Sequence, residues 1–112
     1  MGRSLSIYGL PTACILGIVL VSGVLAGERA PRDSRELERL LKQDCGSCHG
    51  LTLRGGLGPP LTPDALADKS DEQLMETIAS GRAVNAMPPW GILLERGEIR
   101  WLVNRLRRGE AP

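Results

Sequence analysis

The chain has 112 residues, enough for one domain, and carries 14 Lys and Arg against 13 Asp and Glu. This near-balance of charge, with no basic run interleaved with aromatic residues, excludes a nucleic-acid partner. With no Phe, two Trp and one Tyr, a domain this small buries a thin core and needs a staple or a large apolar group to complete it.

Residues 1–26 have the three-part layout of a secretory signal peptide. Arg3 supplies the positive start, Leu5 to Leu25 is largely apolar, and Ala26 ends a run of small or modest residues. We expect cleavage after Ala26, which places the mature chain in the periplasm without a membrane anchor. The alternative is a retained anchor, but Pro11 and several glycines interrupt a stretch that barely reaches the ~20 apolar residues of a span.

A helix is predicted at the start of the domain that we expect over residues 34–108. Residues 27–33 form a polar tail, at the end of which Asp33 or Ser34 can cap this helix. Apolar side chains then recur at the spacing i, i+3, i+4, i+8, typical of an amphipathic helix that ends near Asp44. They are Leu37, Leu40, Leu41 and Cys45.

Two loops rich in glycine and proline interrupt the rest of the chain. Gly50 to Pro63 is too dense in Gly and Pro for a regular element, apart from a short helical turn over 62–67. Residues 82–91 contain two consecutive prolines and form the second loop. Long ordered loops in compact domains are usually functional, so both are candidate parts of a site.

Two further helices are predicted around these loops. Ser70 and Gln73 can form a capping box, and Gly81 stands where a helix commonly ends. The last helix runs from about Glu95 to Arg108, with apolar residues at helical spacing, and residues 109–112 form a C-terminal tail. No strand pattern of useful length is present. We therefore predict an all-α domain of three main helices and two long loops.

The pentapeptide Cys45-Gly46-Ser47-Cys48-His49 indicates the chemistry, because C-x-x-C-H is typical of a c-type haem attachment site. Two thiols three positions apart can each form a thioether with a haem vinyl group. The adjacent His49 then lies beneath the iron as an axial ligand. One covalent haem c would also fill the thin core.

Three other interpretations of this motif are weaker. A zinc site needs a fourth ligand, and the predicted mature chain has no Cys or His outside the motif. A thioredoxin-type redox pair needs a βαβ context, which the pattern lacks. A structural disulfide is compatible with an oxidising compartment but does not account for His49.

Met75 and Met87 are the candidates for the second axial ligand. Met75 lies in a helix among leucines, where methionine commonly fills gaps in a core. Met87 precedes two prolines, which stiffen the backbone of its loop, so we assign the ligand to Met87. An open or water-ligated iron is the alternative. His/Met ligation leaves no open site, which favours an electron-transfer protein over an enzyme.

Further residues are candidates for contacts around the haem. A haem-bound His usually donates its other ring N–H to a carbonyl, and Pro59 offers the candidate acceptor. Arg54 and the Trp90 indole can reach a haem propionate, although a solvated Arg or a packed Trp explains each equally well.

Four segments together resemble a known family. C-G-S-C-H-G from residue 45, G-P-P-L from residue 58, M-P-P-W from residue 87 and the basic last helix resemble a class I cytochrome c. They are more closely similar to cytochrome c55X of denitrifying bacteria, associated with cytochrome cd1 nitrite reductase. The resemblance implies the same iron ligands, adds Leu61 as a haem-packing residue, and implies that the first and last helices cross. Arg105 departs from the family, which often has an aromatic there; Trp101, one turn earlier, is the candidate replacement.

The resemblance also implies a function. The chain is expected to carry single electrons as a monomer, either to cytochrome cd1 nitrite reductase or in making its d1 haem. A small surface at the haem edge would serve brief encounters with redox partner proteins. The residues expected on it are Gly55, Gly56, Leu57, Ala86 and Pro88. The competing hypotheses are a haem enzyme or sensor with an open sixth site, and a tetrapyrrole-handling assembly factor.

Overall fold

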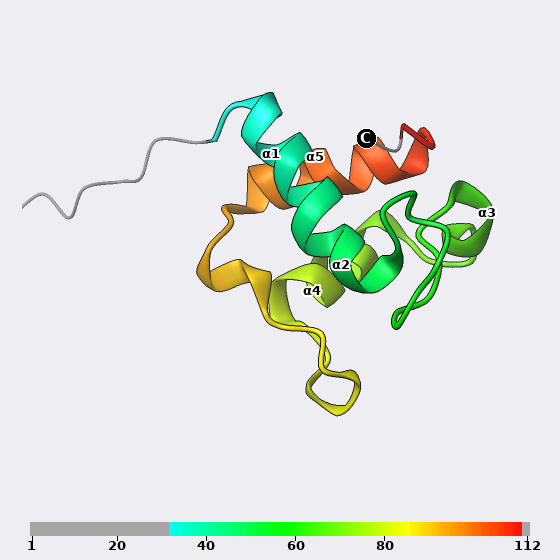
Figure 1. The fold of residues 1–112 in the computed structure, drawn as a ribbon. Coiled ribbons are helices and arrows are strands. Elements are labelled where there is room, and N and C mark those ends of the chain that lie inside the picture. The colour runs from blue at the N-terminus through cyan, green and yellow to red at the C-terminus, as the bar shows by residue number, and fades with distance from the viewer. Residues whose placement is uncertain (1–31, 111–112) are drawn as a thin grey trace, which may run out of the picture.

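The computed structural model describes residues 32–110, so the predicted signal peptide over 1–26 lies outside the described part. In the described part the regular elements are helices, with one isolated antiparallel bridge between Arg82 and Met87 (Figure 1). This confirms the all-α class. None of the helices between Arg32 and Glu110 has the length and apolar character that a membrane crossing requires.

The first helical stretch is built from three consecutive segments. They are α1 (Ser34–Leu40), the π-helical η1 (Leu41–Cys45) and α2 (Gly46–His49). Asp33 caps α1, since its side chain accepts a hydrogen bond from the Glu36 N–H at 2.8 Å. The prediction that this helix ends near Asp44 is wrong, because the helical stretch continues to His49. It stops where Gly50 takes φ +87°, a conformation that favours glycine.

The η1 segment explains how the helix passes the predicted end. The Gly46 N–H donates to the Leu41 carbonyl, five residues earlier, as in a π-helix. Such turns are rare and occur frequently at functional sites. Here the π-helical turn ends at Cys45, the first thiol of the motif.

The remaining elements follow the sequence prediction closely. They are α3 (Pro63–Leu66), α4 (Asp71–Ser80), the 3-10 turns η2 (Ala83–Asn85) and η3 (Trp90–Ile92), and α5 (Arg96–Arg107). Both arms of the Ser70–Gln73 capping box are present, at 3.2 and 2.8 Å. Gly81 ends α4 with φ +67°. Glu95 caps α5, where its backbone N–H donates to the Glu98 carboxylate at 2.8 Å.

The loop after α2 has no regular element but is ordered by backbone hydrogen bonds. Gly55 N–H donates to His49 O and Gly58 N–H donates to Cys48 O, each at 2.8 Å. Farther along, Leu61 N–H donates to Leu53 O at 2.8 Å, and the Leu53 side chain is buried. The loop is therefore fastened to the end of α2 and to the core.

The core joins the helices through leucines. α4 packs on α5, and α1 lies across α5 in Figure 1. The buried cluster consists of Leu37, Leu41, Leu53, Leu66, Leu74, Met75, Leu94, Ile99, Leu102, Val103 and Leu106. Met75 is 4% exposed within this cluster, in agreement with its interpretation as a core residue.

Ion pairs connect the start of the described chain and α1 to α5. The Arg32 guanidinium lies 3.1 Å from the buried Glu98 carboxylate, and the Arg32 N–H donates to the same group at 2.7 Å. Arg105 pairs with Glu38 of α1 at 2.8 Å and lies 5.6 Å from the centre of the Trp101 ring. At the position where the family often has an aromatic, this chain thus joins the two helices by a charged group stacked on the tryptophan.

Candidate functional site

A cavity of about 860 Å³ opens between α2, the loop that follows it, α4 and the loop over 82–90. This volume falls within the range of about 300–1,000 Å³ that cofactor pockets occupy. Much of the wall is apolar. Its leucines are Leu40, Leu41, Leu57, Leu61, Leu66, Leu74, Leu94, Leu102 and Leu106. The cavity is therefore suited to a large, mainly apolar group.

Cys45 and Cys48 line this cavity one helical turn apart, Cys45 at the end of η1 and Cys48 within α2. Both are free thiols, so the structure gives no support to a disulfide. Burial, with a smaller contribution from the negative charge of Asp44, raises the pKa of the Cys45 thiol to about 11. The two thiols therefore face the space that the sequence predicts for the haem vinyl groups.

His49 lines the same cavity with a defined ring orientation. Its Nδ1 lies 2.7 Å from the Pro59 carbonyl oxygen, the acceptor that the sequence analysis named. Because a carbonyl only accepts, Nδ1 must carry the proton, and Nε2 of the neutral ring keeps the lone pair that a metal binds. Gly58 leaves room for the ring, since a Cβ added there would lie 2.8 Å from Cε1 and Nδ1.

Met87 is half-buried and contributes to the opposite loop of the cavity wall. The bridge over residues 82–87 holds it, with Arg82 N–H donating to Met87 O at 2.9 Å and Met87 N–H to Arg82 O at 3.2 Å. Gly81 permits the close approach, because an added Cβ would lie 2.5 Å from the Met87 carbonyl oxygen. Met75, in the core, is not among the cavity-lining residues.

The structure separates the other candidates. Leu61 and the half-buried Trp90 line the cavity, whereas Arg54 is exposed and does not. Lys69 and Arg82 do line it, and sequence reasoning missed both. No motif marks them, because Lys69 precedes the α4 cap and Arg82 follows the α4 end as ordinary charged residues.

Of the residues expected on the docking surface, some line the cavity and others do not. Leu57 is 94% exposed and lines the cavity, together with the exposed Ala86 and Pro88. Gly56 is exposed and Gly55 is half-buried, but neither lines the cavity. Leu57, Ala86 and Pro88 thus form a small apolar rim at its mouth.

The donor set fits haem c better than a bare metal ion. Between Arg32 and Glu110, no group of three or more His, Cys, Asp and Glu side chains is placed to hold a metal ion, which disfavours a zinc site. By contrast, two thiols, one imidazole and one thioether surround a cavity with an apolar wall. These groups match the attachment and axial-ligand chemistry of haem c.

The fold and this site define a c-type cytochrome. The family described as "Cytochrome C oxidase, cbb3-type, subunit III" matches residues 32–104, and the chain belongs to this family of c-type cytochromes. Its cofactor is therefore a covalently bound haem c, and its class is that of electron carriers.

Individual relatives show which c-type cytochromes this chain resembles. Cytochrome c55X of Pseudomonas aeruginosa is 54% identical over 79 residues, which cover 70% of this chain and 66% of that protein. Cytochrome c55X of Stutzerimonas stutzeri is 48% identical, over 84% of this chain and 88% of that protein. The solved c-type cytochrome NirC is 54% identical with a TM-score of 0.68, covering 72% of this chain and 100% of that chain. The resemblance to cytochrome c55X is thus confirmed.

A larger protein contains a segment similar to this chain. The dihydro-heme d1 dehydrogenase of Pseudomonas aeruginosa is 36% identical over 73 residues, which cover 65% of this chain but 14% of that protein. The likeness therefore concerns one cytochrome-sized part of the dehydrogenase.

Proposed function

We propose that this chain is a periplasmic single-electron carrier in which Cys45 and Cys48 attach the haem and His49 and Met87 are its axial ligands. Haem c supplies a one-electron couple when bound. Each thiol would add its S–H bond across one vinyl group, so that a thioether forms and nothing is released. The observation that carries the proposal is the imidazole of His49, oriented by Pro59 in a cavity that Met87 also lines.

The hydrogen bond to Pro59 has two consequences for His49. It fixes the ring plane and the tautomer, so that Nε2 needs no rearrangement before binding iron. It also increases the basicity of the imidazole, which stabilises ferric iron relative to ferrous iron. The backbone of the loop over 50–61 thus takes part in setting the reduction potential.

Met87 favours electron transfer over catalysis on a bound substrate. A thioether on the iron raises the reduction potential, and its presence leaves no coordination position for a substrate. Gly81 and the bridge between Arg82 and Met87 restrict the loop, so the thioether is offered from a defined backbone. This argument disfavours a haem enzyme or sensor with an open site.

The partner that we propose is cytochrome cd1 nitrite reductase, approached through the rim formed by Leu57, Ala86 and Pro88. A small exposed rim suits brief encounters of a monomer better than a permanent complex. A second candidate, a redox step in making d1 haem, is supported by the likeness to dihydro-heme d1 dehydrogenase.

Replacing the proposed ligand tests the iron coordination. Met87→His should keep the haem attached and lower the reduction potential, because imidazole stabilises ferric iron more than thioether does. The red absorption band of methionine-ligated ferric haem should also disappear. Met75→Leu is the matched control, because it changes a core methionine that does not line the cavity. An unchanged potential in Met87→His, or wild-type ferrous protein that binds carbon monoxide readily, would contradict this coordination.

The partner is tested separately, by mixing the reduced carrier with oxidised cytochrome cd1 nitrite reductase in a stopped-flow instrument. Rapid oxidation that slows as a competing carrier is added would support direct electron delivery. If the reductase oxidised this carrier no faster than it oxidises an unrelated reduced c-type cytochrome, the d1 haem role would be favoured instead. Co-purification with the d1 haem machinery would then be the expected result.

A further inference from the structure

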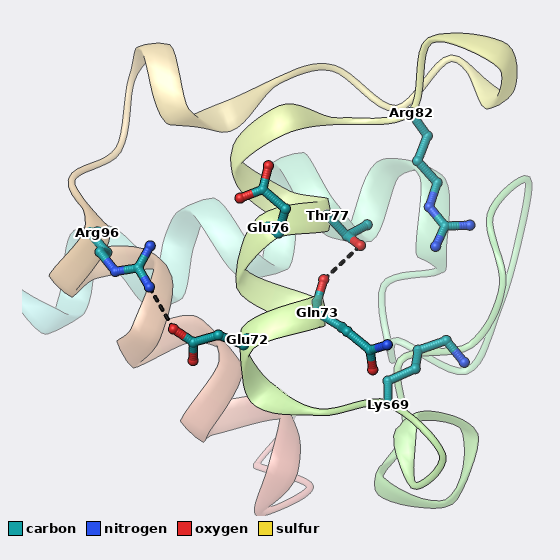
Figure 2. A pocket seen from close by; sticks show the side chains of 7 residues that line it. All are labelled: Lys69, Glu72, Gln73, Glu76, Thr77, Arg82 and Arg96. Atoms are coloured by element: carbon teal, nitrogen blue, oxygen red, sulfur yellow. Dashed lines mark hydrogen bonds and ion pairs between the residues drawn. The ribbon is translucent and has the colours of Figure 1, made fainter.

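Two cationic side chains line the cavity that is proposed to hold the haem. Lys69 precedes α4 and Arg82 follows it, so both lie along one side of the cavity. The same two residues line a shallower groove of about 650 Å³ on the outer face of α4 (Figure 2). They therefore mark the edge where the cavity meets solvent.

The other charged side chains around the cavity show that its positive charge lies on one side. Asp44 of η1 is the one acidic side chain among the cavity-lining residues of the described chain. The other charged residues of the outer groove are Glu72, Glu76 and Arg96. Arg96 is paired with Glu72 at 2.6 Å, so its charge is already balanced. The cavity is consequently cationic toward α4 and anionic toward η1.

Arg82 has its charged group available. Within residues 32–110 its guanidinium has no hydrogen bond or ion pair, whereas its backbone is held by the bridge to Met87. Lys69 donates to the exposed Asp68 carboxylate at 2.7 Å, and its own side chain is 39% exposed. Figure 2 shows Lys69 and Arg82 extending to the same side of α4, away from the ion pair of Arg96.

A haem carries two propionate carboxylates, which must either reach water or be paired with cations, because burial of an unpaired charge is costly. Most of the cavity wall is apolar and offers no such partner. The edge at Lys69 and Arg82 offers both solvent and positive charge. No other part of the described cavity wall combines these two features.

We propose that Lys69 and Arg82 bind the haem propionates, and that they thereby orient the haem with its carboxylates toward α4. This inference rests on the proposed haem site and assigns the propionate contacts to these two cations in place of Arg54. Arg82 then has two functions, since its backbone places Met87 and its side chain binds a carboxylate. A change at the propionates would thus be transmitted to the loop that carries the ligand.

The wild-type holoprotein gives a direct test by nuclear magnetic resonance. We expect nuclear Overhauser contacts from the propionate methylene protons to the side-chain protons of Arg82 and Lys69. Contacts to Arg54 instead would overturn the inference. This measurement needs no substitution, so a variant that fails to fold does not affect it.

The pH dependence of the reduction potential gives the second test. An ionised propionate stabilises ferric iron, so the potential falls as the pH rises through the propionate pKa. A neighbouring cation lowers that pKa. Arg82→Gln should therefore move this fall upward by about 1 pH unit, the lower end of the effect of a nearby charge, because Arg82 is exposed. Arg82→Lys should restore most of the wild-type profile.

Arg54→Gln and Arg96→Gln are the matched controls, since each removes one positive charge from a residue outside the cavity wall. Superimposable profiles for Arg82→Gln and wild type, or an equal shift in the Arg54→Gln control, would overturn the inference. In both cases a wild-type protein with covalent haem would leave the proposed function standing. Wild-type protein without covalent haem would overturn the proposed function and this inference together.

Discussion

Gly58→Ala provides a sharp steric test of the haem-ligand site. Gly58 does not have a left-handed φ, so its backbone accepts alanine without conformational strain. The added methyl group would nevertheless lie 2.8 Å from Cε1 and Nδ1 of the His49 ring. Real Cβ atoms essentially never approach so closely, and ordinary contact begins near 3.4 Å. The ring, or the loop that carries Pro59, must therefore move by about half an ångström.

The cost of this movement follows from packing and from the hydrogen bond. Overpacking of a well-packed site costs about 1–3 kcal/mol. Weakening the 2.7 Å contact between His49 Nδ1 and Pro59 O would remove part of the roughly 0.5–1.5 kcal/mol of a hydrogen bond. We therefore expect the free energy of unfolding to fall by about 2 kcal/mol, which is a decrease in Tm of roughly 8–16 °C for a domain of this size.

The assay combines thermal unfolding with redox titration of the purified holoprotein. A weaker bond to Pro59 makes His49 a poorer donor, so the reduction potential should rise while the Tm falls. Gly97→Ala is the control: nothing lies within 4 Å of an added Cβ there, and alanine is preferred over glycine in the α5 helix. If Gly58→Ala matched wild type in both Tm and potential, the proposed orientation of His49 by Pro59 would be refuted.

Two further predictions concern the fold and the rim. Burial alone would raise the pKa of Glu98, but hydrogen bonds from the Arg32 and Glu95 backbone and the Arg32 charge outweigh it and lower that pKa. The ionised Glu98 carboxylate therefore stabilises the fold above pH ~4.3, and this stabilisation is lost as the pH falls through the lowered pKa. Glu98→Gln should lower the free energy of unfolding by about 1–3 kcal/mol in denaturant titrations at pH 7 and by much less in acid. Equal losses at both pH values would contradict this reasoning. Leu57→Asp should slow electron transfer to the partner without changing the Tm. Ile92→Asp, at an exposed position that does not line the cavity, should leave the transfer rate unchanged. Equal transfer rates for Leu57→Asp and wild type would exclude the rim as the docking surface.

Local signals account for the features that could be predicted. The Ser70–Gln73 box lies within four residues, and Gly81 ends the helix at the expected position, because a cap depends on adjacent backbone. The all-α class could be predicted because apolar residues recur at helical spacing, and these same residues form the buried core. The contact between His49 and Pro59 could also be predicted from the sequence. It spans only ten residues, and a haem-bound histidine usually donates its other ring N–H to a carbonyl.

Features that depend on distant parts of the chain were not predictable. Arg32 and Glu98 are 66 residues apart, and no sequence pattern relates them. Lys69 and Arg82 line one cavity only because α4, which they flank, forms part of its wall, whereas Arg54, near the motif in sequence, does not line it. The π-helical turn was missed because apolar spacing around it still fits an ordinary helix.

The π-helical turn has a consequence for how the length of this helix can vary. A backbone hydrogen bond that spans five residues encloses one residue more than the usual bond that spans four. The η1 segment therefore rotates α2 about the helix axis relative to α1. Upstream, Leu37 is directed into the core; downstream, Cys48 is directed into the cavity. Deleting a single residue of η1 would turn one face by about 100° relative to the other. Insertions and deletions should therefore be selected against within these five residues.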